Sequence, residues 1–325
     1  MKLLDCTLRD GGYQNAWKFS DDFIDRYILL MDAIGVDVIE LGIRSNKRQA
    51  NVGELSYSPD EYIEKLPNTS ARYSVLSNIS EFVDEDISYL RKLFPKSSNE
   101  SKFTVVRLAG SYEDILQCER HIDYIKSLGF TVCLNLMRVS TVSRQLLASM
   151  IKKLDTDAFD VFYVADSFGS LEPSAVNEII DLICTIKNVE IGVHFHDNKG
   201  LALINTIEAH SCGANWLDTT LMGMGRGAGN AATEKFITSI GKDHRLSEAV
   251  DFIESYVMPF FANSPWGPAV DFYLSGLWNI HPNFVSKMRD MHLSGVDRIK
   301  VLKFLKTSEC ENFNIEHLRG ALEQI

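Results

Sequence analysis

The chain has 325 residues, of which 45% are hydrophobic and 24% charged, and its net charge at neutral pH is −11. This composition is ordinary for a globular protein, and the acidic balance argues against a nucleic-acid partner, since phosphate binding needs clustered lysine and arginine. The chain has no apolar run of roughly 18 residues, and Asp5 interrupts any signal-peptide core, so we expect a cytoplasmic protein without a membrane partner.

Eight β-rich runs recur along the chain, and their interiors are nearly continuous Val, Ile, Leu and Phe. Such runs are typical of parallel strands that are buried on both faces. The predicted strands are residues 3–8, 36–43, 72–77, 103–109, 130–137, 160–165, 190–196 and 215–222. Helix-like stretches separate them. One begins at Ser20 and ends before Gly35, and another spans residues 111–129.

This alternation predicts an α/β fold, namely a (β/α)8 TIM barrel over residues 1–244. Eight alternations over about 240 residues match the size of that barrel. A doubly wound open sheet is the alternative, but it often carries a glycine-rich phosphate loop after its first strand, which is absent here. The strand signal stops near residue 245, so residues 245–325 are predicted to form a helical C-terminal extension.

Polar residues gather at the carboxyl ends of the predicted strands, where barrels of this kind place their active sites. They are Arg9 and Asp10 after the first strand, Glu40 in the second, Arg107 in the fourth, Asp166 after the sixth, His194 and His196 in the seventh, and Arg226 and Asn230 after the eighth. Scattered loop polarity would not produce this convergence. The pattern therefore predicts a functional site at that end of the barrel.

His194 and His196 are the most informative pair in this set. Residues i and i+2 of a strand point to the same face, so the two imidazoles can close on one metal ion. The alternative is a pair of hydrogen-bonded histidines at a strand end. Their place at the mouth of a barrel, with an acid after the first strand and an asparagine after the eighth, favours a metal site.

Three segments resemble, in order, the signatures of the pyruvate carboxyltransferase-like, or DRE-TIM, metallolyase superfamily. They are DCTLRDG at 5–11, VHFHDN at 193–198 and GMGRGAGNAATE at 223–234. Within that superfamily the chain is most similar to the metal-dependent 4-hydroxy-2-oxovalerate aldolases. The resemblance implies a class II-type aldolase, a carbon–carbon lyase. Such an enzyme would cleave a 4-hydroxy-2-oxo acid to pyruvate and an aldehyde, or form the acid from them, through a metal-stabilised pyruvate enolate.

The resemblance also implies roles for single residues. Asp10, His194 and His196 would hold a divalent metal, with Asn230 as a further ligand in some branches, and Arg9 would be catalytic. Oxygen and imidazole donors suit Mn²⁺ or Mg²⁺, with Zn²⁺ and Co²⁺ as alternatives. The metal would act as a Lewis acid, and the guanidinium would stabilise the charge that develops on the enolate oxygen.

Gly11 and Gly12 follow the Arg9–Asp10 pair directly. Glycine has no side chain and adopts backbone conformations that other residues avoid. We therefore expect a sharp turn after Asp10 and a close approach of the substrate.

Two positions depart from the aldolases. Tyr13 stands where those enzymes carry an acid/base histidine. A tyrosine with a pKa near 10 is a poor base but a good proton donor, so Tyr13 is a candidate catalytic residue. His281 could take the role instead, and it is a candidate substrate-binding residue. Arg226 replaces a small residue and could bind a phosphate or a second carboxylate of the substrate, or it could be a solvated loop arginine.

Three further residues are assigned by position. Arg107 is a candidate for substrate binding, with the barrel interior as the alternative. Glu40 is expected to support the site from behind the ligands. Asp166 could support the metal ligands in the same way or cap the helix that follows the sixth strand.

Two other functions remain open. One is a Claisen-type enzyme that condenses an acyl-CoA with a 2-oxo acid, and the other is a metal-binding barrel without catalysis, which Tyr13 keeps open. The expected ligand is a small 2-oxo acid. Related aldolases often pair with an acylating aldehyde dehydrogenase, and neither that partner nor a homodimer is decided by the sequence.

Overall fold

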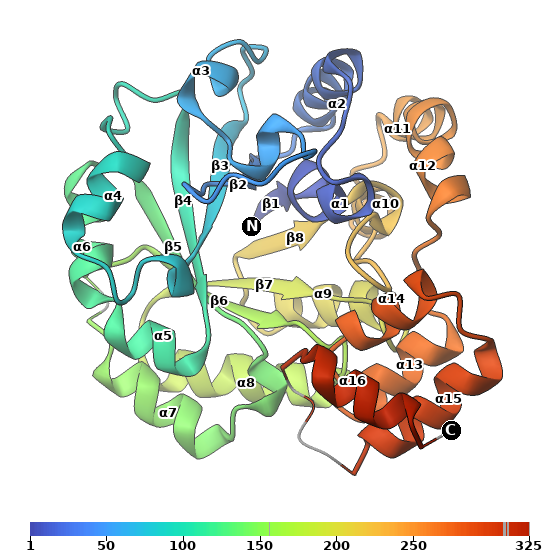
Figure 1. Ribbon diagram of the computed structural model, residues 1–325. Coiled ribbons are helices and arrows are strands. Elements are labelled where there is room, and N and C mark those ends of the chain that lie inside the picture. The colour runs from blue at the N-terminus through green and yellow to red at the C-terminus, as the bar shows by residue number, and fades with distance from the viewer. Residues whose placement is uncertain (156, 308–309, 311, 325) are drawn as a thin grey trace.

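The structure, a computed structural model, describes residues 1–325 except 156, 308, 309, 311 and 325. Within the described residues, the strands pair in parallel in chain order and close into a barrel of eight (Figure 1). They are β1 (Lys2–Asp5), β2 (Val38–Ile43), β3 (Arg72–Asn78), β4 (Phe103–Gly110), β5 (Thr131–Leu136), β6 (Val161–Asp166), β7 (Glu190–Phe195) and β8 (Trp216–Thr219). The predicted TIM barrel is confirmed.

Closure of the barrel depends on β1, which pairs with both β2 and β8. Leu4 of β1 lies opposite Val38 of β2 on one side and Asp218 of β8 on the other. The interior is filled at this level by buried apolar side chains, which include Val105, Tyr163 and Trp216. The barrel is thus a packed core whose open space is confined to its ends.

Helices form the outer layer around the strands (Figure 1). Those that follow the strands are α1 (Thr7–Asn15), α2 (Asp21–Ile34), α3 (Asp60–Ile63), α4 (Ile87–Leu93), α5 (Tyr112–Gln117), α6 (Glu119–Ser127), α7 (Arg144–Lys153), α8 (Pro173–Ile186), α9 (Ala202–Ser211) and α10 (Thr233–Ser239). The described part of the chain has no helix that is both long enough and apolar enough to cross a membrane.

Local signals explain where several helices begin and end. The Ser20 side chain accepts a hydrogen bond from the Phe23 amide at the start of α2, and Gly35 ends that helix with a left-handed φ of 84°. The single helix predicted over 111–129 is wrong in one respect, because it breaks into α5 and α6. Cys118 leaves helical geometry between them, with φ −96° and ψ 10°, and its buried thiol donates to the Ile115 carbonyl.

The C-terminal residues form α11 (Leu246–Phe252), α12 (Met258–Asn263), α13 (Val270–Leu277), α14 (Asn283–Asp290), α15 (Gly295–Leu305) and α16 (Ile315–Leu322). Helices α11 and α12 pack on the barrel, where Phe252 and Phe260 contact Phe23 of α2. Helices α13 to α16 enclose a second apolar core that includes Phe284 and Leu302. The helical extension is therefore present, while the division at residue 244 stays a prediction.

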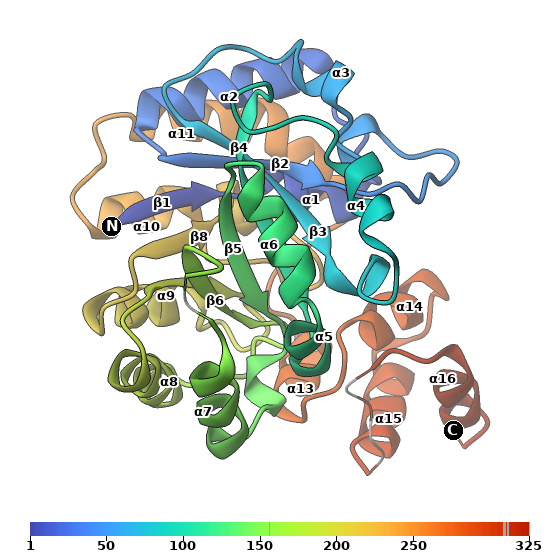
Figure 2. The same cartoon turned by 90° about the vertical axis from the view of Figure 1, so that its left-hand side faces the viewer.

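Helices α13 to α16 of the extension lie beyond the carboxyl ends of the strands (Figure 2). Polar contacts join it to the barrel loops. The Asn198 amide donates to the Phe272 carbonyl at 3.3 Å, and the Trp266 indole donates to the Met222 carbonyl at 2.9 Å. These contacts hold the extension beside the end of the barrel that carries the site.

Candidate active site and metal centre

Strand β7 presents two histidines to the interior of the barrel mouth. His194 is in the strand and His196 follows its last residue, so the two side chains point to the same side, with ring centroids 5.1 Å apart. An isolated β-bridge pairs His196 with Asn230 in the loop after β8. The period-2 geometry of a strand thus explains the histidine pair, and the bridge brings Asn230 to it.

Asp10 reaches the site from a helix, which corrects the expectation of a strand end and a sharp turn. Strand β1 ends at Asp5, and Gly11 and Gly12 lie inside α1. A Cβ atom on Gly11 would lie 2.9 Å from Met224 Sδ. A Cβ atom on Gly12 would lie 2.2 Å from the Trp17 ring. The glycines therefore serve close packing of neighbouring side chains against α1.

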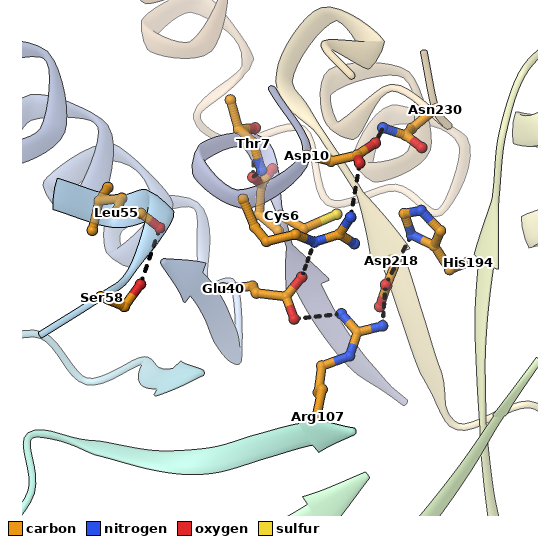
Figure 3. Close-up of polar contacts among 12 residues, drawn as sticks. Cys6, Thr7, Asp10, Glu40, Leu55, Ser58, Arg107, His194, Asp218 and Asn230 are labelled. Carbon is orange, nitrogen blue, oxygen red and sulfur yellow. Dashed lines mark hydrogen bonds and ion pairs between the residues drawn. The ribbon is translucent and has the colours of Figure 1, made fainter. Parts of the chain in front are cut away.

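The side chains of Asp10, His194 and His196 form a buried cluster whose candidate ligand atoms all lie within 4.8 Å of one another. The Asn230 amide donates to Asp10 Oδ2 at 2.5 Å (Figure 3). Within the described part of the chain, His194 Nε2 and Asn230 Oδ1 are buried without a hydrogen-bond partner. Two orphaned acceptors beside a carboxylate are the environment that a cation satisfies, so these residues fit a divalent metal.

Neighbouring acceptors set the tautomers of both histidines. His194 Nδ1 lies 3.0 Å from Asp218 Oδ2, and His196 Nδ1 lies 3.2 Å from the Gly229 carbonyl oxygen. Since a carboxylate and a carbonyl only accept, each Nδ1 carries the proton and each Nε2 keeps its lone pair. This is the arrangement that commonly orients metal-binding histidines.

Protonation states in the cluster also favour a cation. Burial lowers the pKa of His196 to about 3, so its imidazole is neutral at physiological pH. Burial alone would raise the pKa of Asp10, but Arg9 and the two histidines outweigh it and hold that pKa well below its usual value. The cluster therefore offers one carboxylate and a neutral imidazole at neutral pH.

A chain of alternating charges runs beneath the cluster and joins two of its members. Arg9 Nη1 donates to Asp10 Oδ1 at 2.7 Å, and Arg9 Nε donates to Glu40 Oε2 at 2.6 Å. Arg107 continues the chain. Its Nη1 lies 3.1 Å from Glu40 Oε1, and its Nη2 donates to Asp218 Oδ2 at 2.6 Å (Figure 3). Because Asp218 also faces His194, the chain starts and ends at metal-ligand candidates.

The structure places Glu40 where the sequence analysis expected it, in contact with Arg9 and behind the cluster. It places Arg107 in the barrel interior, fully buried and stacked on Tyr163 at 4.2 Å, and not in the mouth. Both arginine pKa values are raised, since the adjacent carboxylates outweigh the effect of burial. The sequence analysis missed Asp218. A single acid within the apolar run of β8 was the signal that could have found it.

A small cavity of about 80 Å³ opens over the cluster, and we call it the mouth pocket. Arg9, Asp10, His194 and His196 line it. Its walls include Asn135 and Ser167, which the sequence analysis also missed. Tyr13 and Arg226 lie at its rim, and Arg226 Nε is buried without a hydrogen-bond partner among the described residues.

Tyr13 extends from α1 over the mouth pocket and packs edge-on against Trp17. Desolvation inside the mouth raises the pKa of Tyr13, although 48% of the residue remains exposed. The nearby Arg226 and Arg9 offset part of that rise. The phenol is therefore protonated at neutral pH and can act as a donor.

Two other sequence candidates lie outside the cluster. Asp166 accepts a hydrogen bond from the Leu171 amide at 2.8 Å, so it closes the loop after β6, in line with its capping alternative. His281 precedes α14, where its Nδ1 accepts from the Asn283 amide at 3.2 Å. Burial lowers the pKa of His281 to about 3, with Arg226 adding to the effect, so this ring is neutral.

Comparisons with known proteins identify relatives of this chain. A family model described as HMGL-like matches residues 98–256. The chain is 29% identical to a 4-hydroxy-2-oxovalerate aldolase of Pelotomaculum thermopropionicum, over 74% of this chain and 70% of that protein. It is 28% identical to an oxaloacetate decarboxylase of Mycobacterium tuberculosis, over 77% of this chain and 72% of that protein.

Two solved structures resemble the whole fold. The N-terminal domain of a Bacteroides vulgatus protein, described as a candidate aldolase, aligns with a TM-score of 0.79 and 28% identity over 92% of this chain and 99% of that one. The carboxyl transferase domain of Rhizobium etli pyruvate carboxylase aligns with a TM-score of 0.70 over 93% of this chain and 55% of that one. At 15% identity, the second likeness concerns the fold alone.

Proposed function

We propose that this chain, which is similar to the HMGL-like family over residues 98–256 and to 4-hydroxy-2-oxovalerate aldolases, is a metal-dependent aldolase. It would cleave a 4-hydroxy-2-oxo acid to pyruvate and an aldehyde, or form the acid from these two compounds. One observation carries the proposal. The cluster of Asp10, His194 and His196 lines a pocket together with Arg9, and His194 Nε2 and the adjacent Asn230 Oδ1 are buried without a hydrogen-bond partner among the described residues.

Asp10, His194 and His196 would hold the divalent ion, with Asn230 Oδ1 as a further ligand. Carboxylate, amide and imidazole donors suit Mn²⁺ or Mg²⁺, with Zn²⁺ and Co²⁺ as alternatives. When bound, such an ion supplies Lewis acidity toward the keto and carboxylate oxygens of a 2-oxo acid.

Arg9 would stabilise the charge that develops on the substrate. Its Nε and Nη1 atoms are held by Glu40 and Asp10, which leaves Nη2 without a hydrogen-bond partner among the described residues. Because Arg9 lines the mouth pocket, this donor is available to the keto oxygen. As the C3–C4 bond breaks, its electrons move toward that oxygen and form the enolate of pyruvate. A preorganised donor at that point stabilises the developing negative charge and so lowers the activation barrier, because no solvent has to reorganise around it.

Tyr13 would transfer a proton to or from the oxygen on C4 of the 4-hydroxy-2-oxo acid. In the direction of condensation, the enolate carbon attacks the aldehyde, and the protonated phenol of Tyr13 donates its proton to the aldehyde oxygen. Cleavage runs the same transfer in reverse: the deprotonated form of Tyr13, which its raised pKa makes scarce at neutral pH, takes the proton of the 4-hydroxyl as the C3–C4 bond breaks and the aldehyde leaves. The enolate then takes a proton from solvent at C3 to give pyruvate, and Tyr13 returns its proton to solvent.

The proposal is tested by following exchange of the pyruvate methyl protons with deuterium by NMR, with and without Mn²⁺. We expect exchange that depends on the metal. The substitution His194→Ala should abolish both this exchange and stoichiometric Mn²⁺ binding. Release of pyruvate from a 4-hydroxy-2-oxo acid, measured by coupled reduction, tests the complete reaction. A wild-type protein that binds Mn²⁺ but exchanges no protons would favour a metal-binding barrel without this chemistry.

Oxaloacetate decarboxylation is a second candidate, and two observations favour it. One is the similarity to the Mycobacterium tuberculosis decarboxylase. The other is Tyr13, because loss of CO₂ yields the same enolate without removing a proton from a hydroxyl group. Release of CO₂ from oxaloacetate by the Mn²⁺ protein, compared with cleavage of a 4-hydroxy-2-oxo acid, separates the two reactions. Consumption of acetyl-CoA with 2-oxo acids would instead reveal a Claisen-type enzyme.

A further inference from the structure

A second and larger cavity adjoins the mouth pocket, and we call it the outer cavity. It has a volume of about 500 Å³ and is bordered by α1, the loop after β8 and the C-terminal extension. The lining residues on which the argument depends are Tyr13, Gln14, Arg226, Asn283, Ser286 and Arg289. Tyr13 and Arg226 line both cavities, so the two spaces meet at these side chains.

The volumes bear on the size of the substrate. The mouth pocket, at about 80 Å³, has room for a group of pyruvate size over the metal ligands. The outer cavity falls within the range of roughly 300–1,000 Å³ that is usual for ligand sites. A two-carbon aldehyde would leave most of that space to water. The geometry therefore fits an aldehyde that continues beyond its carbonyl group, past Tyr13 and into the outer cavity.

The charges on the wall favour an anionic ligand. Arg226 has no ion-pair partner among the described residues, and its Nε atom is buried without an acceptor. Arg289 donates from Nε and Nη2 to Asp271, at 3.0 Å and 2.6 Å. Arg298 also donates to Asp271, at 2.8 Å, so two guanidinium groups share one carboxylate. Asp290 is the acid in the lining, and it is exposed at the rim.

The rest of the wall offers hydrogen bonds to a polar ligand. The Gln14 amide bridges the barrel and the extension, since it donates to the Gly225 carbonyl and accepts from Ser264 at 2.8 Å. The half-buried side chains of Asn283 and Ser286 have no hydrogen-bond partner among the described residues. They are therefore available to hydroxyl groups of a ligand.

We propose that the aldehyde substrate is an extended, hydroxylated aldehyde with a carboxylate or phosphate group, and that Arg226 selects it by pairing with that anion. The inference rests on the proposed aldolase function and adds the substrate class. Asn283 and Ser286 bind the hydroxyl groups of the chain, and Arg289 adds positive charge at the far wall. Arg226 is thus a specificity-determining residue, and the extension that carries α14 supplies the wall opposite it.

The test is condensation of pyruvate with matched pairs of aldehydes by the Mn²⁺-loaded protein. Glyceraldehyde 3-phosphate is paired with glyceraldehyde, and succinic semialdehyde is paired with butanal. We expect kcat/KM to favour the anionic member of a pair by about ten- to a hundredfold, the usual contribution of a charge-assisted hydrogen bond. The pair with the larger ratio identifies the anion as phosphate or carboxylate.

Substitution then assigns the preference to a residue. Arg226→Gln should bring the ratio within the preferred pair close to one. The matched control is Arg319→Gln, which removes the same charge from the exposed face of α16 and should leave the ratio at its wild-type value. Added salt should reduce the wild-type preference, because the outer cavity is open to solvent.

Two results would overturn the inference. One is equal use of the anionic and neutral aldehydes by the wild-type protein. The other is an equal fall for both members in Arg226→Gln together with loss of pyruvate proton exchange, which would place Arg226 on the carboxylate of pyruvate. Absence of exchange in the wild-type protein would overturn the proposed function, whereas exchange without an aldehyde preference overturns only the substrate class.

Discussion

Replacing Asp218 with asparagine tests a residue that is not itself a metal-ligand candidate but that contacts one, His194. The Asp218 carboxylate accepts from Arg107 at 2.6 Å and faces His194 Nδ1 at 3.0 Å, and all three side chains are buried. Asparagine keeps the size of the side chain but removes its charge. Arg107 then retains Glu40 as its carboxylate partner, and His194 can face an amide that donates as readily as it accepts.

Two effects of this substitution can be estimated. Breaking a buried ion pair by removing one partner typically costs about 3–5 kcal/mol of stability, because the other charge stays buried. Losing the group that orients a metal-binding histidine typically lowers metal affinity by about 10- to 100-fold. The Arg107–Glu40 contact persists, so we expect the loss of stability to lie toward the lower end of its range.

The two effects are measured separately. Urea unfolding of the metal-free protein reports the ion pair, and titration with Mn²⁺ by calorimetry reports the histidine. Glu248→Gln is the comparison, because it neutralises an acid in the exposed pair with Arg245 and should change neither quantity. If Asp218→Asn unfolds like the wild-type protein and binds Mn²⁺ with the same affinity, the charge chain does not support the site.

Three other substitutions test single steps. Arg9→Lys should keep Mn²⁺ binding but lower turnover by about 10²–10³, since lysine lacks the planar guanidinium, and near-native turnover would remove Arg9 from the mechanism. Tyr13→Phe should slow condensation while exchange of the pyruvate methyl protons persists, and Tyr13→His should retain condensation activity. A Tyr13→Phe variant that condenses at the wild-type rate would indicate a packing role for Tyr13. The folded protein keeps His281 neutral down to a pKa of about 3, while the unfolded chain binds that proton below about 6.5. The free energy of unfolding should therefore fall as the pH drops through this window, and less steeply in His281→Gln, whereas equal slopes would contradict the assignment.

Local patterns were enough to predict the architecture. Continuous apolar runs identify strands that are buried on both faces, and serine and glycine mark the two ends of α2. The alternation of strands and helices then leaves few alternatives to a closed parallel barrel. The helix over 111–129 was predicted less well, since its break at Cys118 involves a buried thiol that the apolar pattern does not distinguish.

The placement of Asp10 shows where local reasoning ended. The pair of glycines after it suggested a turn, because glycine favours turns when nothing else is known. In the fold these residues continue α1, and the space without side chains is taken by Met224 and Trp17. Met224 is more than two hundred residues away along the chain, so no local rule could anticipate this packing.

The sequence by itself determined the barrel, the histidine pair on one face of a strand and the order of the polar strand ends, because each depends on the regular geometry of one element. Only the tertiary structure decided which charges meet. Asp218 contacts His194 because β8 lies beside β7, and it contacts Arg107 because β4 and β8 face each other across the interior of a closed barrel. The outer cavity likewise exists because the extension folds back beside Tyr13 and Arg226, and contacts between segments so distant in the chain depend on how the whole molecule packs.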